Sequence, residues 1–295
     1  MGIAAKAGRM LLQAFVVALV AVLLSSNAYS REPDYENLAY GDNDLQTVDV
    51  YLPNNVENAP IIFMVHGGAW RFGDKTAEAV VKNKLSRWVS KGFIFVSANY
   101  RLWPEAGPLE QVHDIAKALA YVQTKAKSIG ANSDKIILLG HSAGAHIISV
   151  LATSETIASD YNVKPWLGTI SIDTAALDIV ALMEREHFRL YDRVFGEDKD
   201  YWESVSPQHL LKELKRPLLA ICSIQRRDGP CNSAEIFARK SSKYPVRAQV
   251  LKVDLSHREA NFELGGDNPY TEKVELFMKT LDTRVAGMLE SEHMQ

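Results

Sequence analysis

Short runs of apolar residues alternate along the chain with longer segments in which apolar residues recur at helical spacing. Solid apolar runs of roughly four to eight residues are typical of strands buried on both faces, and a spacing of about three to four residues is typical of packed helices. Residues 45–51 alternate polar and apolar positions instead, which predicts an exposed strand. The predicted strands are 45–51, 61–65, 93–98, 135–139, 167–172, 218–223 and 248–253, and the predicted helices are 76–91, 109–129, 143–153, 234–243 and 271–289.

This order of strands and helices predicts an α/β fold with a mostly parallel central sheet and helices on both faces. In such sheets, functional side chains gather where the strands end, so the residues of a candidate site should directly follow strands. Residues 174–216 interrupt the order because they contain no convincing strand. Two interpretations of this insertion stay open, namely helices with core-facing aromatics or a small lid over the strand ends. Its aromatic residues are Phe188, Tyr191, Phe195, Tyr201 and Trp202.

The N-terminal segment has the layout of a secretory signal peptide. Two basic residues precede an apolar run at residues 10–24, and the small residues Ala28 and Ser30 precede a plausible cleavage point. We expect residues 1–30 to be removed, leaving 31–295 as one exported domain, periplasmic or secreted, with no stable membrane partner. The alternative is an uncleaved N-terminal membrane anchor, because about 15 apolar residues could form a short span.

The strongest chemical signal is the sequence Gly-His-Ser-Ala-Gly at residues 140–144. It follows the predicted strand 135–139 and opens the predicted helix 143–153, which is the context required of a G-x-S-x-G nucleophile elbow. The serine of such an elbow sits on a tight turn, so its neighbours must be small. The following helix points its amide groups at the reacting oxygen and favours negative charge there. The pattern therefore predicts Ser142 as a nucleophile.

A second motif, His-Gly-Gly-Ala-Trp at residues 66–70, comes directly after the buried run 61–65. Together with Asn-Tyr-Arg-Leu-Trp-Pro-Glu at 99–105, it resembles the α/β-hydrolase esterases that have an HGG-type oxyanion loop. That group includes hormone-sensitive-lipase-like esterases, feruloyl or acetyl esterase-like carboxylesterases and kynurenine formamidases. The resemblance runs from about residue 45 to about residue 265, and it implies an α/β-hydrolase fold for the domain.

The resemblance also implies roles for the residues of this loop. Acyl transfer passes through a tetrahedral oxyanion, and one fixed amide donor can be worth about 10²–10³ in rate. By resemblance, the amides of Gly68, Ala69 and Ala143 are the donors, and Gly67 shapes the turn. Many relatives carry a third glycine in place of Ala69, and an amide donor survives that change. His66 precedes the glycines, so we expect it to orient the loop.

Among eight histidines, His257 is the predicted general base. It follows the strand 248–253 within a few residues, and residues 256–261 resemble the family's terminal histidine loop. A neutral imidazole can take the proton of Ser142 and return it to the leaving group. The other histidines are expected to be structural: His66, His113, His141, His146, His187, His209 and His293.

The acid partner of the histidine is predicted to be Asp228. It follows the strand 218–223 and stands where relatives place their acid, one helix and one strand before the histidine. The sequence Gln-Arg-Arg-Asp at 225–228 departs from the usual Gly-x-x-Asp spacing. The two arginines favour an ionised Asp228, and they equally fit a surface ion pair. Asp173 and Asp178, which follow the preceding strand, remain alternatives.

The chain contains two cysteines, Cys222 and Cys231, which bracket this acid loop. In an oxidising compartment they could form a disulfide that holds the loop. The closed loop is short, so the gain in stability would be about 2–3 kcal/mol. Two buried free thiols are the alternative.

Composition removes several other classes of function. The net charge is -3 and no stripe of basic residues occurs, so nucleic acid is not an expected partner. Neither metal-binding nor phosphate-binding motifs occur, so no metal or cofactor is expected. The combined prediction is a serine hydrolase that cleaves small-molecule carboxylic esters of small to medium acyl groups through an acyl-enzyme on Ser142. The alternatives are an arylformamidase, which the HGG-x-W pattern with Trp70 allows, and a non-catalytic hydrolase-fold binding protein.

Overall fold

The computed structural model describes residues 31–154 and 156–290. Residues from Pro33 onwards form one compact unit, and the fold belongs to this unit. The expected signal peptide at residues 1–30 lies outside the described residues. Within the described ranges, no helix combines the length and the apolar character needed to cross a membrane.

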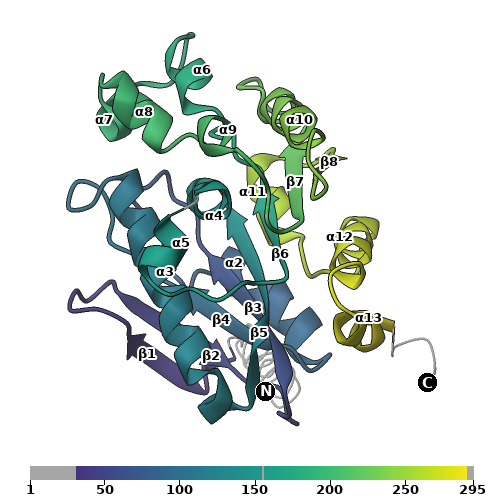
Figure 1. The fold of residues 1–295 in the computed structure, drawn as a ribbon. Helices are drawn as coiled ribbons and strands as arrows, with labels where there is room; N and C mark the ends of the chain where they lie inside the picture. Colours follow the sequence, from purple (N-terminus) through teal and green to yellow (C-terminus); the bar gives the residue numbers. More distant parts are fainter. Residues whose placement is uncertain (1–30, 155, 291–295) are drawn as a thin grey trace, which may run out of the picture. The chain divides into compact units, whose positions relative to one another are not determined.

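In the described part of the chain, one eight-stranded sheet forms the centre of the unit, with the strand order β1-β2-β4-β3-β5-β6-β7-β8 (Figure 1). The two pairings of β2 are antiparallel, and all pairings from β4 to β8 are parallel. This confirms the predicted α/β class. The strands are β1 Tyr35–Ala39, β2 Thr47–Tyr51, β3 Ala59–Val65, β4 Ile94–Ala98, β5 Ala131–His141, β6 Gly168–Ile172, β7 Leu218–Ser223 and β8 Ala248–Val253.

Two strands differ from the sequence prediction, and both differences lie at one edge of the sheet. Strand β1 was not predicted, because most of its side chains are exposed and it contains no apolar run. Strand β2 was predicted to be exposed, yet all of its residues are buried. The reason is that β2 pairs with both β1 and β4, and that Val48 and Val50 join one apolar core while Tyr51 joins the other.

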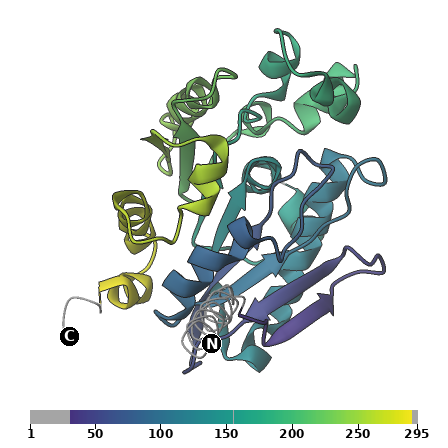
Figure 2. The same cartoon turned by 180° about the vertical axis from the view of Figure 1, so that it is seen from behind.

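Helices cover both faces of the sheet, as Figures 1 and 2 show from opposite sides. Helices α3 and α4 pack on the face that carries Phe63 and Leu138, and α2, η1, α12 and α13 pack on the face that carries Ile62 and Leu139. The helices are α2 Glu78–Lys84, η1 Leu85–Val89 (a π-helical turn), α3 Pro108–Lys125, η2 Ala126–Ile129 (3₁₀), α4 Ala143–Thr153, α5 Ile157–Asp160, α6 Ile179–Met183, α7 Arg189–Phe195, α8 Lys199–Ser204, α9 Pro207–Leu210, α10 Pro230–Ser241, α11 His257–Phe262, α12 Pro269–Lys279 and α13 Thr283–Glu290.

The insertion at residues 174–216 contains the short helices α6 to α9 and, within its described residues, no strand. In both Figures 1 and 2 these helices lie beyond the end of the sheet at which β5 passes into α4. Tyr191, Phe195 and Trp202 are buried, whereas Phe188 is 65% exposed. These three buried aromatic residues belong to the same apolar cluster as Trp70 and the residues of α3 and α4, and they extend it above the strand ends. Both interpretations of the segment agree with this position.

The carboxyl ends of β5, β6 and β7 are joined by main-chain hydrogen bonds that extend beyond the strands. The amide of Ser142 donates to the carbonyl of Ile172 (2.8 Å), and the amide of Asp173 donates to the carbonyl of Ile221 (2.8 Å). Residues that directly follow neighbouring strands are thus held side by side.

Candidate active site

Ser142 occupies a strained turn between β5 and α4. Its φ of 55° and ψ of -115° are rare for a residue with a side chain, and such strain persists only where the surroundings enforce it. The flanking glycines are required sterically. A Cβ on Gly144 would lie 2.3 Å from the carbonyl oxygen of Val65, and a Cβ on Gly140 would lie 2.7 Å from the carbonyl oxygen of Gly144. The turn therefore has the steric properties of a nucleophile elbow.

A continuous relay of hydrogen bonds begins at this serine. Oγ of Ser142 lies 2.9 Å from Nε2 of His257, and Nδ1 of His257 lies 2.6 Å from Oδ2 of Asp173. Because the carboxylate accepts, Nδ1 carries a proton, which leaves Nε2 of the neutral ring free to accept the serine proton. His257 is the first residue of α11, and a capping box between Ser256 and Glu259 fixes the start of this helix.

Asp173 follows β6 directly and is fully buried. Its Oδ1 accepts a hydrogen bond from the amide of Ser223 (2.8 Å), and its Oδ2 also accepts from Nη1 of Arg226 (3.0 Å). Burial by itself would raise the pKa of Asp173, but the hydrogen bond from His257 and the charge of Arg226 outweigh it and hold the pKa below its ordinary value. The carboxylate is therefore ionised at neutral pH.

The structure does not bring the predicted acid, Asp228, to the histidine. The carboxylate of Asp228 is instead paired with the guanidinium of Arg226. Of the two alternatives, Asp173 contacts His257, whereas Asp178 caps α6 by accepting from the amide of Ala181 (3.0 Å). The observed acid differs from the predicted one for a topological reason. The aspartate that reaches the histidine follows β6, and the loop after β7 contributes an arginine.

Arg226 connects the two aspartates. It donates to both carboxylates and to the main-chain oxygen of Asp173 (2.7 Å), and its side chain is 18% exposed. Its Nη1 also lies 2.9 Å from Nδ1 of His257. Since Nδ1 already donates its proton to Asp173, this last contact brings a positive charge close to the ring and is not a hydrogen bond. The signal available in the sequence was the departure of residues 225–228 from the usual spacing.

The loop that follows β3 lies against the elbow. A Cβ on Gly67 would lie 3.0 Å from Cβ of Ser142, and a Cβ on Gly68 would lie 1.9 Å from the carbonyl oxygen of Phe72. Ala69 has a φ of 55°, so it keeps a left-handed backbone although it carries a side chain. Ala143 is the first residue of α4, so its amide has no partner within the helix. The predicted role of Gly68, Ala69 and Ala143 as oxyanion donors stays a proposal.

His66 orients this loop through its ring. Its Nδ1–H donates to the carbonyl of Gly67 (2.7 Å), and its ring stacks on Tyr100 at 4.5 Å between centroids. The hydroxyl of Tyr100 donates to the carbonyl of His66 (3.0 Å). Burial lowers the pKa of His66, so the ring is neutral. These contacts agree with an orienting role.

Trp70 links the same loop to the insertion. Its indole N–H donates to Nδ1 of His146 (3.1 Å), whose Nε2–H donates to the carbonyl of Val205 (2.7 Å). Burial lowers the pKa of His146 to about 4, so this histidine is neutral. The Trp70 ring also packs edge-on against Phe195 and Tyr191 of α7. A shift of α7 would therefore displace Trp70 and, with it, the loop beside Ser142.

His141, which we expected to be purely structural, supports the candidate base. Its Nε2–H donates to the carbonyl of His257 (3.0 Å), and the two rings are 4.5 Å apart. Burial and, to a smaller extent, the neighbouring His257 lower the pKa of His141 to about 3, so His141 is uncharged. It positions the main chain of His257 without competing for its proton.

The helix that begins with His257 is anchored at its other end by the buried Lys84 of α2. Its Nζ donates to the carbonyls of Asn261 (2.6 Å) and Ala79 (2.9 Å). Asn83 donates to the carbonyl of Phe262 (2.6 Å). Burial lowers the pKa of Lys84 to about 7. The position of α11 is thus fixed at both ends.

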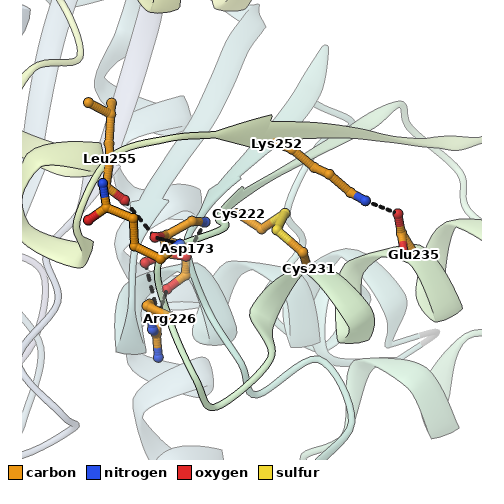
Figure 3. Close-up of a disulfide and its surroundings, with 9 residues drawn as sticks. Asp173, Cys222, Arg226, Cys231, Glu235, Lys252 and Leu255 are labelled. Atoms are coloured by element: carbon orange, nitrogen blue, oxygen red, sulfur yellow. Dashed lines mark hydrogen bonds and ion pairs between the residues drawn. A yellow bond between two sulfur atoms is a disulfide. The ribbon is translucent and has the colours of Figure 1, made fainter.

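Cys222 and Cys231 are joined by a disulfide (Figure 3). Cys222 lies in β7 and Cys231 lies in the first turn of α10. The closed loop contains Arg226, and Ser223 follows Cys222 directly, so two of the groups that contact Asp173 are held by the disulfide. Within the described residues, no cluster of three or more His, Cys, Asp or Glu residues could hold a metal ion.

The fold and the Ser142–His257–Asp173 arrangement define an α/β hydrolase. Residues 48–221 match the BD-FAE family, and the chain belongs to this family.

Relatives and structural neighbours agree with this assignment. A probable isoprenylcysteine alpha-carbonyl methylesterase, ICMEL1 of Arabidopsis thaliana, is 30% identical over 73% of this chain and 48% of its own length. Kynurenine formamidase of Salmo salar is 25% identical over 61% of this chain and 57% of its own length. The chain spans about half the length of the curated relatives it matches. Esterase B of Lactobacillus rhamnosis has the same fold, with a TM-score of 0.68 over 98% of this chain and 99% of that one at 19% identity. The family is one of esterases and related hydrolases.

Proposed function

We propose that this protein is a serine esterase that cleaves carboxylic esters of small to medium acyl groups. One observation carries the proposal: Oγ of Ser142, both ring nitrogens of His257 and the buried carboxylate of Asp173 form one unbroken relay, with distances of 2.9 and 2.6 Å. The names of the methylesterase relative and of the esterase structure support an ester as the substrate.

The chemistry follows from the protonation states of the relay. Nε2 of His257 takes the proton of Ser142 as Oγ attacks the carbonyl carbon, and the imidazolium that forms is stabilised by ionised Asp173. The amides of Gly68, Ala69 and Ala143 are the proposed donors to the oxyanion. The imidazolium then gives its proton to the leaving alcohol, which departs and leaves the acyl-enzyme. A water molecule, deprotonated by His257, hydrolyses the acyl-enzyme and returns Ser142 to its free form.

The proposed preference for small to medium acyl groups rests on the size of the insertion. Residues 174–216 form only short helices, and Trp70 ties them to the oxyanion loop. We also propose export by the N-terminal segment, followed by its removal. The disulfide between Cys222 and Cys231 supports an oxidising compartment.

The test is a panel of p-nitrophenyl esters from acetate to decanoate, together with N-formylkynurenine. Wild type should hydrolyse the short esters fastest, and Ser142→Ala should lose at least about a thousandfold in kcat. Ser90→Ala, at an exposed serine far from the elbow in sequence, is the matched control and should behave like wild type. Ester hydrolysis that survives in Ser142→Ala would contradict the mechanism.

An arylformamidase remains the second candidate, supported by the kynurenine formamidase relative. The pattern that allowed it depends on Trp70, whose side chain is buried and bonded to His146. That contact gives the indole a packing role, so the ester is the favoured substrate. Faster turnover of N-formylkynurenine than of any ester would reverse this preference. No turnover of any substrate would favour a non-catalytic binding protein instead.

A further inference from the structure

A cavity with a volume of about 640 Å³ lies between the insertion and the loop after β7. One wall comes from the end of α6 and from α7, where Arg185, Phe188 and Tyr191 line it. The opposite wall comes from Arg227 and Asp228. None of these side chains belongs to the serine–histidine–aspartate relay, so the proposed reaction gives the cavity no role.

The cations of this cavity are not balanced by its carboxylates. Asp228 is already paired with Arg226 outside the cavity. Arg185 donates only to the main-chain oxygen of Asp228 (2.8 Å). Among residues 31–154 and 156–290, neither Arg185 nor Arg227 forms an ion pair with a carboxylate. Glu186 is the single lining acid left without a basic partner in these ranges, so two guanidinium groups face one carboxylate.

A third positive charge lies at the rim. Nδ1 of His187 points at the carbonyl of Arg185 (2.6 Å), and its Nε2 points at Oδ1 of Asp192 (2.8 Å). Both partners are acceptors, so only the doubly protonated imidazolium satisfies both contacts. The hydrogen bond to Asp192 raises the pKa of His187 accordingly. The charge of His187 is balanced by Asp192, so the excess of positive charge from the two arginines is unchanged.

The aromatic side chains make the cavity suited to an organic anion. The ring of Phe188 is 65% exposed and lies 6.4 Å from the ring of Tyr191, which is nearly buried. Ligand sites typically combine apolar walls with a few polar groups, and guanidinium groups bind carboxylates in a bidentate manner. Exposed phenylalanine beside two unpaired arginines therefore fits an apolar or aromatic group that carries a carboxylate.

Both walls of the cavity adjoin the candidate active site. On one side, Arg226 donates to Asp228 and to Asp173, so the cavity wall is one side chain away from the relay. On the other side, the ring of Tyr191 lies 5.9 Å from the ring of Trp70 in the oxyanion loop. The cavity is thus one side chain away from the relay on the side of the acid, and one ring contact away from the loop that carries Trp70.

We propose that this cavity is a subsite for a carboxylate on the substrate, so that the preferred esters are those of acids or alcohols that carry a second, ionised carboxyl group on an apolar or aromatic chain. The proposal rests on the ester hydrolysis proposed above. Arg185 and Arg227 bind the carboxylate, and Phe188 packs against the chain that carries it.

The test compares p-nitrophenyl hemiesters of succinate, adipate and suberate with p-nitrophenyl esters of neutral acids of equal chain length. Wild type should prefer the hemiester at one or more chain lengths, with a kcat/KM at least about tenfold above that of its neutral counterpart, and salt should reduce the preference. In Arg185→Gln/Arg227→Gln the ratio of the two kcat/KM values should fall about tenfold, and in Glu186→Gln it should rise. Arg193→Gln, an exposed arginine of α7 outside the cavity, should keep the wild-type ratio.

Two results would overturn the subsite: equal rates for hemiester and neutral ester at every length, or an unchanged ratio in the double variant. Hydrolysis of neutral esters that depends on Ser142 would in either case leave the proposed function standing. If no ester is hydrolysed, calorimetric binding of monomethyl adipate to Ser142→Ala, with and without the two arginine substitutions, decides the subsite independently. Binding that requires the arginines supports it, and its absence refutes it.

Discussion

Oδ2 of Asp173 lies 2.6 Å from Nδ1 of His257, although the two residues are 84 positions apart in the sequence. The contact places the acid after β6, and it leaves the loop after β7 free to supply Arg226. The acid position is thus occupied by a pair of residues, in which a buried aspartate touches the histidine and an arginine supports the aspartate.

The first prediction separates the two aspartates. Asp173→Asn should lower kcat by about 10³–10⁴, because the amide cannot hold the productive tautomer of His257 or stabilise its charged form. Asp228→Asn should cost less than about tenfold, since Asp228 acts only through Arg226. Steady-state kinetics on one p-nitrophenyl ester, with circular dichroism to check folding, measures both. The opposite order of effects would restore Asp228 as the acid.

The second prediction concerns the support from Arg226. Arg226→Met should move the acidic limb of the kcat/KM profile to higher pH, because the positive charge that helps to hold the pKa of Asp173 down is lost. Protonated Asp173 no longer stabilises charged His257, so activity disappears at a higher pH as the solution is acidified. Arg226→Lys keeps the charge and should restore part of the shift. A uniform drop in rate with an unmoved profile would indicate a purely structural role.

The third prediction uses two glycines as a matched pair. A methyl group on Gly144 would collide with the carbonyl oxygens of Val65 (2.3 Å) and His66 (2.4 Å), whereas a methyl group on Gly287 meets nothing within 4 Å. Gly144→Ala should therefore push the elbow away from the oxyanion loop and cost at least about a hundredfold in kcat. Gly287→Ala, within α13, should keep full activity and gain up to about 1 kcal/mol in stability. Equal kcat values for the two variants would contradict this prediction.

The sequence predicts the buried parts of this fold well, and the reason is physical. Strand β3 and the second half of β5 are apolar runs that must be covered on both faces, so the pattern alone reveals them. Strand β1 is mostly exposed and contains no apolar run, so the pattern does not predict it. The predicted helix 271–289 is two helices, α12 and α13, because apolar spacing continues across residues 280–282 while the backbone turns.

The candidate site was predicted where local geometry demands particular residues. The elbow around Ser142 requires small residues, and His257 follows a strand in a recognisable loop. The acid has no such local requirement, because any aspartate at the end of β6 or β7 could reach the histidine. Only the fold shows that the loop after β7 supplies Arg226 as a partner of Asp173, and that His141 is hydrogen-bonded to the main chain of His257.

The fourth prediction concerns the disulfide. Cys222→Ser/Cys231→Ser should lower the free energy of unfolding by about 2–3 kcal/mol, the value expected for a short closed loop. It should also lower kcat, because Ser223 and Arg226 both contact Asp173. Urea unfolding and ester kinetics measure the two effects. Dithiothreitol should shift wild type towards the variant and leave the variant itself unchanged, and wild-type stability in the variant would contradict the expectation.

The fifth prediction follows from the buried Lys84, whose pKa falls from 10.5 to about 7 on folding. Between these two values the unfolded chain binds more protons than the folded one, so stability rises with pH, by up to about 1.4 kcal/mol per pH unit. Below about pH 7 both states are protonated and the effect is constant. The difference in unfolding free energy between wild type and Lys84→Met, measured in urea at pH 7 and pH 9, should grow in favour of wild type. A difference independent of pH would contradict the lowered pKa.

The hydrogen bonds that continue the sheet beyond its strands have a consequence for how freely this protein can be altered. The amides of Ser142 and Asp173 are each bonded to the neighbouring strand, so the main chains of the nucleophile and the acid are one strand spacing apart, about 4.8 Å. That distance belongs to the backbone of the sheet and is independent of the surrounding loops. A segment exchanged for residues 174–216 therefore leaves this spacing unchanged as long as it keeps the contacts with Trp70 and His146, whereas a single residue inserted within β6 would separate the proton relay.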